Sequence, residues 1–283
     1  MRLWRFAVPN LITATSLTFA FLSVMNAISG HTVPAAWFAL YCVLTDKLDG
    51  FAARLLGATS AFGVQFDSFA DFASFGVAPA TLFYSYLSRN PALGFQAPGP
   101  LRVTLQVATV LYVLLVAFRL ARFNVSAPTG GTKLYFGVPT TQMGGTLLAL
   151  FVTFLKYGDP HATGIGLDRF HGPHLLGHTQ VPTEAWHYWP LIMLAGGALM
   201  VSRLRVPKLG LTQNRVANAI IVANILGVYG FGVIQWLPEY LAGVGLAYLG
   251  MSVIYGQVVQ SAREATRPPL FAGPQPPHDE DEL

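Results

Sequence analysis

Four acidic residues in this sequence have a spacing that suits metal chemistry. The first 158 residues contain only four carboxylates, which are Asp46, Asp49, Asp67 and Asp71. All four lie in apolar sequence, and an ionised carboxylate near the centre of a bilayer costs at least about 2.5–3.5 kcal/mol. Such groups need cations or water around them, so the sequence predicts a functional site that faces the interior of a helix bundle.

Helical periodicity places these carboxylates on two faces that can meet. The first face is formed by Asp46, Asp49, Gly50 and Ala53, and the second by Gly63, Asp67 and Asp71. The intervening turn, around residues 57–60, is short, so the two helices must be antiparallel neighbours. Converging carboxylates repel one another, and divalent cations with a preference for oxygen ligands, such as Mg²⁺, Mn²⁺ or Ca²⁺, would relieve that repulsion.

Small and basic residues accompany the acids. Gly50, Ala53 and Gly63 keep the two faces shallow, so that a phosphorylated group can approach the backbone. Arg54 can offer its fork of donors to a phosphate. The alternative is that the glycines only pack helices and the acids only form ion pairs. However, the acids outnumber the local bases, which are Lys47 and Arg54.

Composition predicts the scaffold that must position these residues. The chain has 283 residues, of which 53% are hydrophobic and 11% charged, and its mean hydropathy is +0.49. Soluble domains carry about 25% charged residues, so we expect an all-α, polytopic membrane bundle of about eight transmembrane helices. The expected spans are 10–30, 34–55, 60–86, 101–121, 138–157, 187–203, 216–236 and 239–259. Residues 1–260 would form one transmembrane catalytic domain, and residues 261–283 a disordered cytoplasmic tail.

The distribution of lysine and arginine predicts the orientation. With eight spans and both termini in the cytoplasm, most of the basic residues fall in cytoplasmic segments. This bias explains the net charge of +4 without a nucleic-acid partner. The turn between the two acidic helices then also faces the cytoplasm.

The segment DKLDGFAARLLGATSAFGVQFDSFAD, residues 46–71, resembles the signature of the CDP-alcohol phosphatidyltransferase family. That signature is Asp-x2-Asp-Gly-x2-Ala-Arg-x8-Gly-x3-Asp-x3-Asp, and every fixed position is met. The resemblance implies a membrane bundle that binds divalent metal through the four aspartates, with Asp71 also the general base. It implies two ions, Mg²⁺ or Mn²⁺, whereas Ca²⁺ could act as an inhibitor. The residues implied to contact or make room for the CDP moiety are Asn10, Asp49, Gly50, Ala53, Arg54 and Gly63.

Softer segments resemble the membrane-integral members of the family that use serine as the acceptor. They are Pro9–Asn10, Phe66–Ala80, Arg119–Asn124 and Tyr135–Thr141. This resemblance implies transfer of a phosphatidyl group from CDP-diacylglycerol to L-serine, which gives phosphatidylserine and CMP. It also implies a homodimer in contact with membrane lipids, in a bacterial inner membrane, with the site facing the cytoplasm.

The carboxylate of serine calls for a cation near the site. Arg119, Arg122 and Lys133 lie in the cytoplasmic segment after the fourth span and are candidates to bind serine or a lipid phosphate. The alternative for each is a simple anchor at the membrane surface.

Other functions remain open at this point. The same chemistry could use glycerol 3-phosphate, inositol phosphate or choline as the acceptor. A cation transporter could use the carboxylates as an ion path, although the Gly, Ala and Arg positions have no clear task there. A non-catalytic lipid-binding scaffold would not need Asp71.

Overall fold

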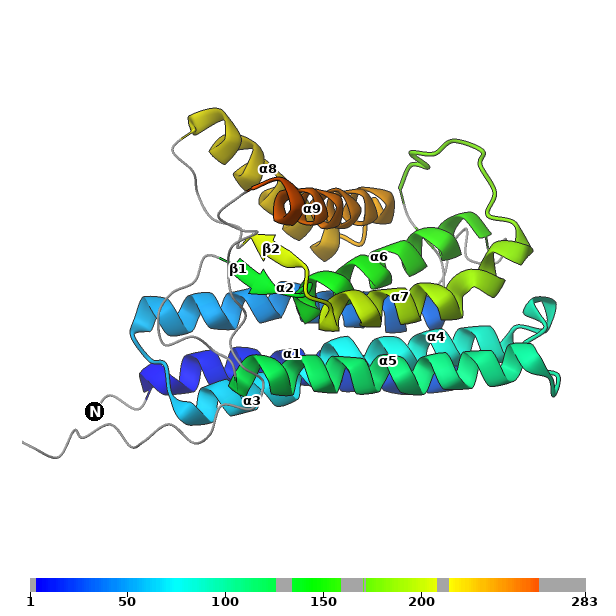
Figure 1. The fold of residues 1–283 in the computed structure, drawn as a ribbon, viewed down its shortest axis with the longest axis horizontal. Helices are drawn as coiled ribbons and strands as arrows, with labels where there is room; N and C mark the ends of the chain where they lie inside the picture. Colours follow the sequence, from blue (N-terminus) through cyan, green and yellow to red (C-terminus); the bar gives the residue numbers. More distant parts are fainter. Residues whose placement is uncertain (1–3, 126–133, 159–169, 171, 208–213, 260–283) are drawn as a thin grey trace, which may run out of the picture.

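The computed structural model describes residues 4–125, 134–158, 170, 172–207 and 214–259, and this part of the chain is almost entirely helical (Figure 1). Its α-helices are α1 (Trp4–Ser29), α2 (Thr32–Leu56), α3 (Ala61–Asp71), α4 (Ala78–Arg89), α5 (Pro100–Val125), α6 (Thr140–Gly158), α7 (Trp189–Val201), α8 (Arg215–Val233) and α9 (Pro238–Val258). Short 3₁₀ turns cover Pro91–Leu93 and Thr183–Tyr188. Two strands, β1 (Leu134–Phe136) and β2 (Arg205–Pro207), pair antiparallel, with Tyr135 opposite Val206.

The all-α architecture predicted from the sequence is confirmed. A π-helical segment, Phe72–Val77, joins α3 and α4 into one continuous rod, so the described helices form eight rods. Each expected span overlaps one of them. The small β1–β2 ribbon was not predicted, and the expected tail at 261–283 lies outside the described residues.

Three of the described helices, α1, α5 and α8, are long and apolar enough to cross a membrane. A span needs about 20 residues. The lengths of α3 and α4 are 11 and 12 residues, so each is too short alone, and α2 contains four charged residues. That all eight rods cross the membrane remains a prediction.

The start of the first helix differs from the start expected from the sequence. We expected it to begin at Asn10, but it begins at Trp4 and runs through Pro9. Proline has no N–H to donate to the carbonyl four residues earlier, so this turn lacks one backbone hydrogen bond. The expected end is confirmed, because Gly30 follows the helix with a φ of +89°, a conformation that favours glycine.

The π-helical segment begins directly after Asp71. Pro79 cannot donate to the carbonyl of Phe75, four residues before it. The buried Tyr112 hydroxyl on α5 donates to that carbonyl instead, over 2.8 Å. Ala78 donates to the carbonyl of Ala73, five residues earlier, which is the π-helical pattern. A side-chain hydroxyl therefore supplies the hydrogen bond that the proline removes.

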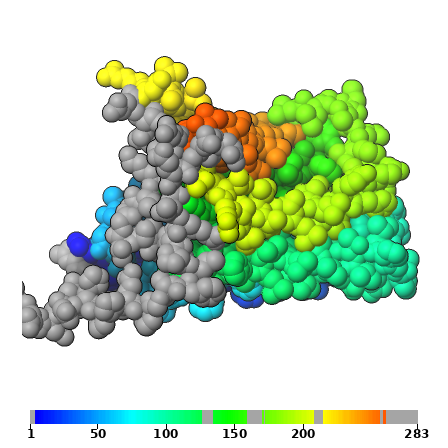
Figure 2. Space-filling view, viewed as in Figure 1, coloured from blue at the N-terminus to red at the C-terminus, as the bar shows by residue number. Residues whose placement is uncertain are grey.

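The rods lie mostly side by side along the long axis of the molecule (Figure 1). Close helix contacts join α1 to α2, α4 to α5, α5 to α7 and α6 to α9. Helix α8 projects from the body of the bundle at one end, as the space-filling view shows (Figure 2). The end of α2 and the start of α3 lie at the same end of the bundle as the start of α1, and the acidic residues are there.

Candidate metal and substrate site

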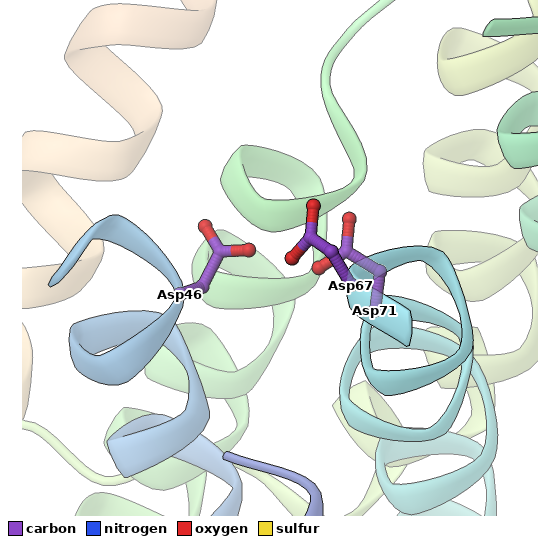
Figure 3. A group of neighbouring side chains, drawn as sticks. All are labelled: Asp46, Asp67 and Asp71. Carbon is purple, nitrogen blue, oxygen red and sulfur yellow. The ribbon is translucent and has the colours of Figure 1, made fainter. Parts of the chain in front are cut away.

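Three of the four predicted carboxylates come together. Asp46 on α2 and Asp67 and Asp71 on α3 each offer an oxygen atom, and these atoms lie within 4.8 Å of one another. Asp67 and Asp71 stand one turn apart on the same helix and face Asp46 across the gap (Figure 3). All three are partly buried. We call Asp46, Asp67 and Asp71 the acidic trio.

The turn between α2 and α3 explains why the trio assembles. Gly57 ends α2 in the left-handed conformation, with a φ of +56°. Ser60 begins α3 because its hydroxyl accepts a hydrogen bond from the Gly63 N–H over 3.0 Å, which is the usual N-cap arrangement. Only residues 57–60 separate the helices, so α3 must return beside α2.

Asp49 stands outside the trio. Its carboxylate accepts hydrogen bonds from the Thr13 hydroxyl on α1 at 2.8 Å and from the Gly50 N–H at 2.5 Å. Both oxygens are therefore engaged by the protein, and Asp49 is buried. Its carboxylate anchors α2 to α1. The role of Thr13 could not be predicted from the sequence, because its partner lies 36 residues away and no local pattern marks it.

Two of the predicted small residues, Gly50 and Gly63, lie next to polar side chains. A Cβ on Gly50 would lie 3.5 Å from Nη1 of Arg54, so the Arg54 guanidinium passes over this glycine. A Cβ on Gly63 would lie 3.4 Å from Oδ1 of Asn10. Asn10 thus reaches the start of α3, next to the site; its contact with the CDP moiety stays a prediction. The structure adds no contact for Ala53, which is partly buried on the same face of α2.

Two cations lie beside the trio within the described residues. Lys47 is 3.4 Å from Asp46, but its side chain is 63% exposed, so this ion pair is weak. Arg119 on α5 is buried and interacts electrostatically with Asp71 and Asp46. Its Nη1 donates to Thr140 Oγ1 over 3.4 Å, and its guanidinium lies 5.0 Å from the Phe123 ring centre. Among the described residues, Arg119 is thus a buried cation that interacts electrostatically with the trio.

The other two predicted acceptor residues differ from Arg119. The buried Arg122 guanidinium donates to the main-chain carbonyls of Phe136, Met200 and Val201, with distances of 2.6, 3.2 and 2.7 Å. These bonds tie β1 and the end of α7 to α5, which is a structural task. Lys133 lies outside the described residues.

Comparison with known proteins identifies the class to which this fold and site belong. The sequence pattern of the CDP-alcohol phosphatidyltransferase family matches residues 6–203. The chain belongs to this family and is an enzyme of the phosphatidyltransferase class.

Similar proteins within this family include enzymes named for a serine acceptor. The chain is similar to the CDP-diacylglycerol–serine O-phosphatidyltransferases of two Helicobacter pylori strains, at 29% and 30% identity. Each match covers 88% of both proteins. It is also similar to the archaetidylserine synthase of Methanothermobacter thermautotrophicus, with 35% identity over 52% of this chain and 58% of that protein.

Proposed function

We propose that this protein transfers the phosphatidyl group of CDP-diacylglycerol to L-serine, releasing CMP. The observation that carries this proposal is the acidic trio, which lies on two antiparallel helices beside faces kept shallow by Gly50 and Gly63. The printed names of the relatives that match most of the chain support serine as the acceptor.

The donor set fits a hard divalent cation. Three carboxylate oxygens within 4.8 Å of one another suit Mg²⁺ or Mn²⁺. Asp46, Asp67 and Asp71 would hold the metal, and Asp49 would take part in a second site only if it released Thr13. Metal bound there would neutralise the pyrophosphate and stabilise the departing CMP oxyanion.

The protein's own groups bind the nucleotide and move the proton. Gly50, Ala53 and Gly63 leave room for the CDP moiety, while Arg54 and Asn10 offer hydrogen bonds to it. The serine hydroxyl oxygen attacks the lipid-side phosphorus, and the bond from that phosphorus to the CMP oxygen breaks. Asp71 accepts the hydroxyl proton as the new bond forms.

We propose Arg119 as the group that meets the serine carboxylate. It is buried, it interacts electrostatically with Asp71, and its guanidinium offers five donors, of which one contacts Thr140. Arg122 is a weaker candidate because three main-chain carbonyls occupy it. Lys133 remains a prediction from the sequence.

The membrane arrangement is part of the same proposal. Residues 1–260 would form a single transmembrane catalytic domain in a bacterial inner membrane, with both termini and the site on the cytoplasmic side. The bias of basic residues supports this orientation. The homodimer is proposed from the family resemblance, and chemical crosslinking in native membranes would test it.

The test is a CMP-release assay on the purified full-length protein with CDP-diacylglycerol and Mn²⁺ or Mg²⁺. L-serine, glycerol 3-phosphate, inositol phosphate and choline are supplied in turn. We expect release that depends on metal and is fastest with serine. Faster release with another alcohol would replace serine by that acceptor, and no release with any alcohol would contradict the transferase proposal.

A further inference from the structure

Helix α8 lies outside residues 6–203, which match the family pattern, yet it contacts the helix that supplies Asp46. The Tyr229 hydroxyl on α8 donates to the Leu44 carbonyl on α2 over 3.1 Å. Leu44 precedes Asp46 by two residues. Tyr229 also interacts electrostatically with both Asp46 and Asp49. A residue beyond the matched segment therefore reaches the edge of the acidic site.

The packing around this bond holds the two helices close together. A Cβ on Gly232, three residues after Tyr229, would lie 3.2 Å from a methyl carbon of Leu44. The lack of a side chain at Gly232 thus allows α8 to lie directly against Leu44. Tyr229 is half-buried in this contact, so water competes less for its hydrogen bond than it would at an open surface.

A second tyrosine links the same helices farther from the acids. The Tyr41 hydroxyl on α2 donates to the Val233 carbonyl over 3.4 Å and accepts from the Gln235 carboxamide over 2.9 Å. Tyr41 precedes Asp46 by five residues, which is about 7.5 Å along a helix. Tyr41 therefore serves as a matched comparison, because it shares the helix pair but not the position next to the site.

We propose that Tyr229 is a positioning residue of the metal site, which acts by fixing the turn of α2 that carries Asp46. The bond from the Tyr229 hydroxyl restrains α2 just before this carboxylate. Asp46 is the one member of the trio that α3 does not supply, so the geometry of the trio depends on how α2 is held. This inference rests on the proposed function, because it assigns Tyr229 to the proposed metal site.

The experiment compares Tyr229→Phe with Tyr41→Phe in the full-length protein. Both changes remove one hydroxyl and keep the ring. Mn²⁺ binding is titrated by electron paramagnetic resonance without substrate, and the Mn²⁺ concentration for half-maximal CMP release is measured separately. We expect Tyr229→Phe to weaken Mn²⁺ binding about three- to tenfold, the effect of one hydrogen bond, and Tyr41→Phe to leave it within about twofold.

The outcomes separate this inference from the proposed function. An equal loss of Mn²⁺ affinity in the two variants would mean that general α2–α8 packing, and not the Tyr229 bond, determines the affinity. Unchanged Mn²⁺ affinity in Tyr229→Phe would mean that its hydroxyl does not position Asp46. Either result overturns the inference. If the wild-type protein binds Mn²⁺ but releases no CMP, the transferase proposal fails, while the binding titration still decides the role of Tyr229.

Discussion

Helix α6 runs between two charged clusters that differ in how their charge is balanced. Near its start, Arg119 contacts Thr140 beside the acidic trio. Near its end, Lys156 forms an ion pair with Glu239 of α9 at 2.7 Å, with side chains that are 0% and 4% exposed. Sixteen residues separate Thr140 from Lys156, which is about 24 Å along a helix.

The cluster at the end of α6 is compensated from within the protein. One oxygen of Glu239 accepts from Lys156 and also from the Tyr157 hydroxyl, at 2.5 Å. Lys156 donates further to the carbonyl of Pro173 at 2.7 Å, and Tyr157 accepts from the Leu176 N–H. These bonds join α6, α9 and the segment that follows residue 172, so this cluster is structural.

The trio is not compensated in this way. Three partly buried carboxylates face one another, and the described cations beside them are one buried arginine and one largely exposed lysine. Burial of charge alone therefore does not mark a functional site in this protein. The mark is buried charge of one sign that exceeds what the protein's own cations neutralise, because bound cations or protons must then balance the remainder.

The largest expected effect is on activity when the trio loses its proposed base. Asp71→Asn keeps the shape of the side chain but cannot accept the serine proton. We expect CMP release to fall by about 10²–10⁴-fold, the usual contribution of general-base catalysis, in protein whose thermal unfolding temperature without metal matches that of metal-free wild type. Turnover within about tenfold of wild type would remove Asp71 from the mechanism.

The second prediction concerns the ion pair between Lys156 and Glu239 in the compensated cluster. Lys156→Met leaves Glu239 buried without its cation, so we expect a loss of about 3–5 kcal/mol of stability, seen as a lower unfolding temperature in a thermal-shift assay. Adding Glu239→Met should restore most of this loss, because the unpaired charge is removed. A Lys156→Met protein as stable as wild type would mean that the ion pair is not structural.

The third prediction concerns metal removal. Chelation should lower the thermal stability of the wild-type protein, by about 2.7 kcal/mol if the metal had been present at one hundred times its dissociation constant. In Asp67→Asn, chelation should have little effect, because the site is already weakened. The Lys156→Met/Glu239→Met double variant is the matched control and should respond to chelation as the wild type does. An equal response of Asp67→Asn and wild type would place the bound metal elsewhere.

The smallest expected effect tests the anchor of Asp49. Thr13→Val removes the hydroxyl that donates to this carboxylate, and a hydrogen bond to a charged group contributes about 1.5–3 kcal/mol. We expect the free energy of unfolding to fall by about this amount, because the buried Asp49 carboxylate loses a donor and α2 loses its anchor on α1. Thr15→Val, which removes only a bond to the Leu11 carbonyl on an exposed face of α1, should leave the unfolding temperature in a thermal-shift assay unchanged. If both variants unfold at the wild-type temperature, the Thr13 bond does not anchor α2.

Local patterns in the sequence predicted much of this arrangement. Hydropathy located the eight rods, Gly30 marked the end of α1, and the i, i+4 spacing placed Asp67 and Asp71 on one face. The short turn at 57–60 then implied that Asp46 would face them. Each of these features depends on residues close together in the chain, which is why the sequence revealed them.

The features that the sequence did not reveal depend on distant partners. The Thr13 hydroxyl binds Asp49, which stands outside the trio. The Tyr112 hydroxyl binds the Phe75 carbonyl that Pro79 leaves without a donor. Glu239 forms an ion pair with Lys156, 83 positions earlier in the chain. Likewise, Arg119 and Arg122 look equivalent in the sequence. Arg119 contacts Thr140 of α6 and interacts electrostatically with Asp71, whereas Arg122 donates to three main-chain carbonyls, because the two side chains reach different neighbours of α5.

A Mn²⁺ titration of the full-length protein, monitored by electron paramagnetic resonance, asks whether the acidic trio binds a divalent cation. We expect bound Mn²⁺ in the wild type, at least a tenfold loss of affinity in Asp46→Asn and Asp67→Asn, and no loss in Glu184→Gln, which changes an exposed acidic residue. Equal Mn²⁺ binding by all four proteins would contradict the claim that the unbalanced carboxylates of α2 and α3 exist to hold divalent cations.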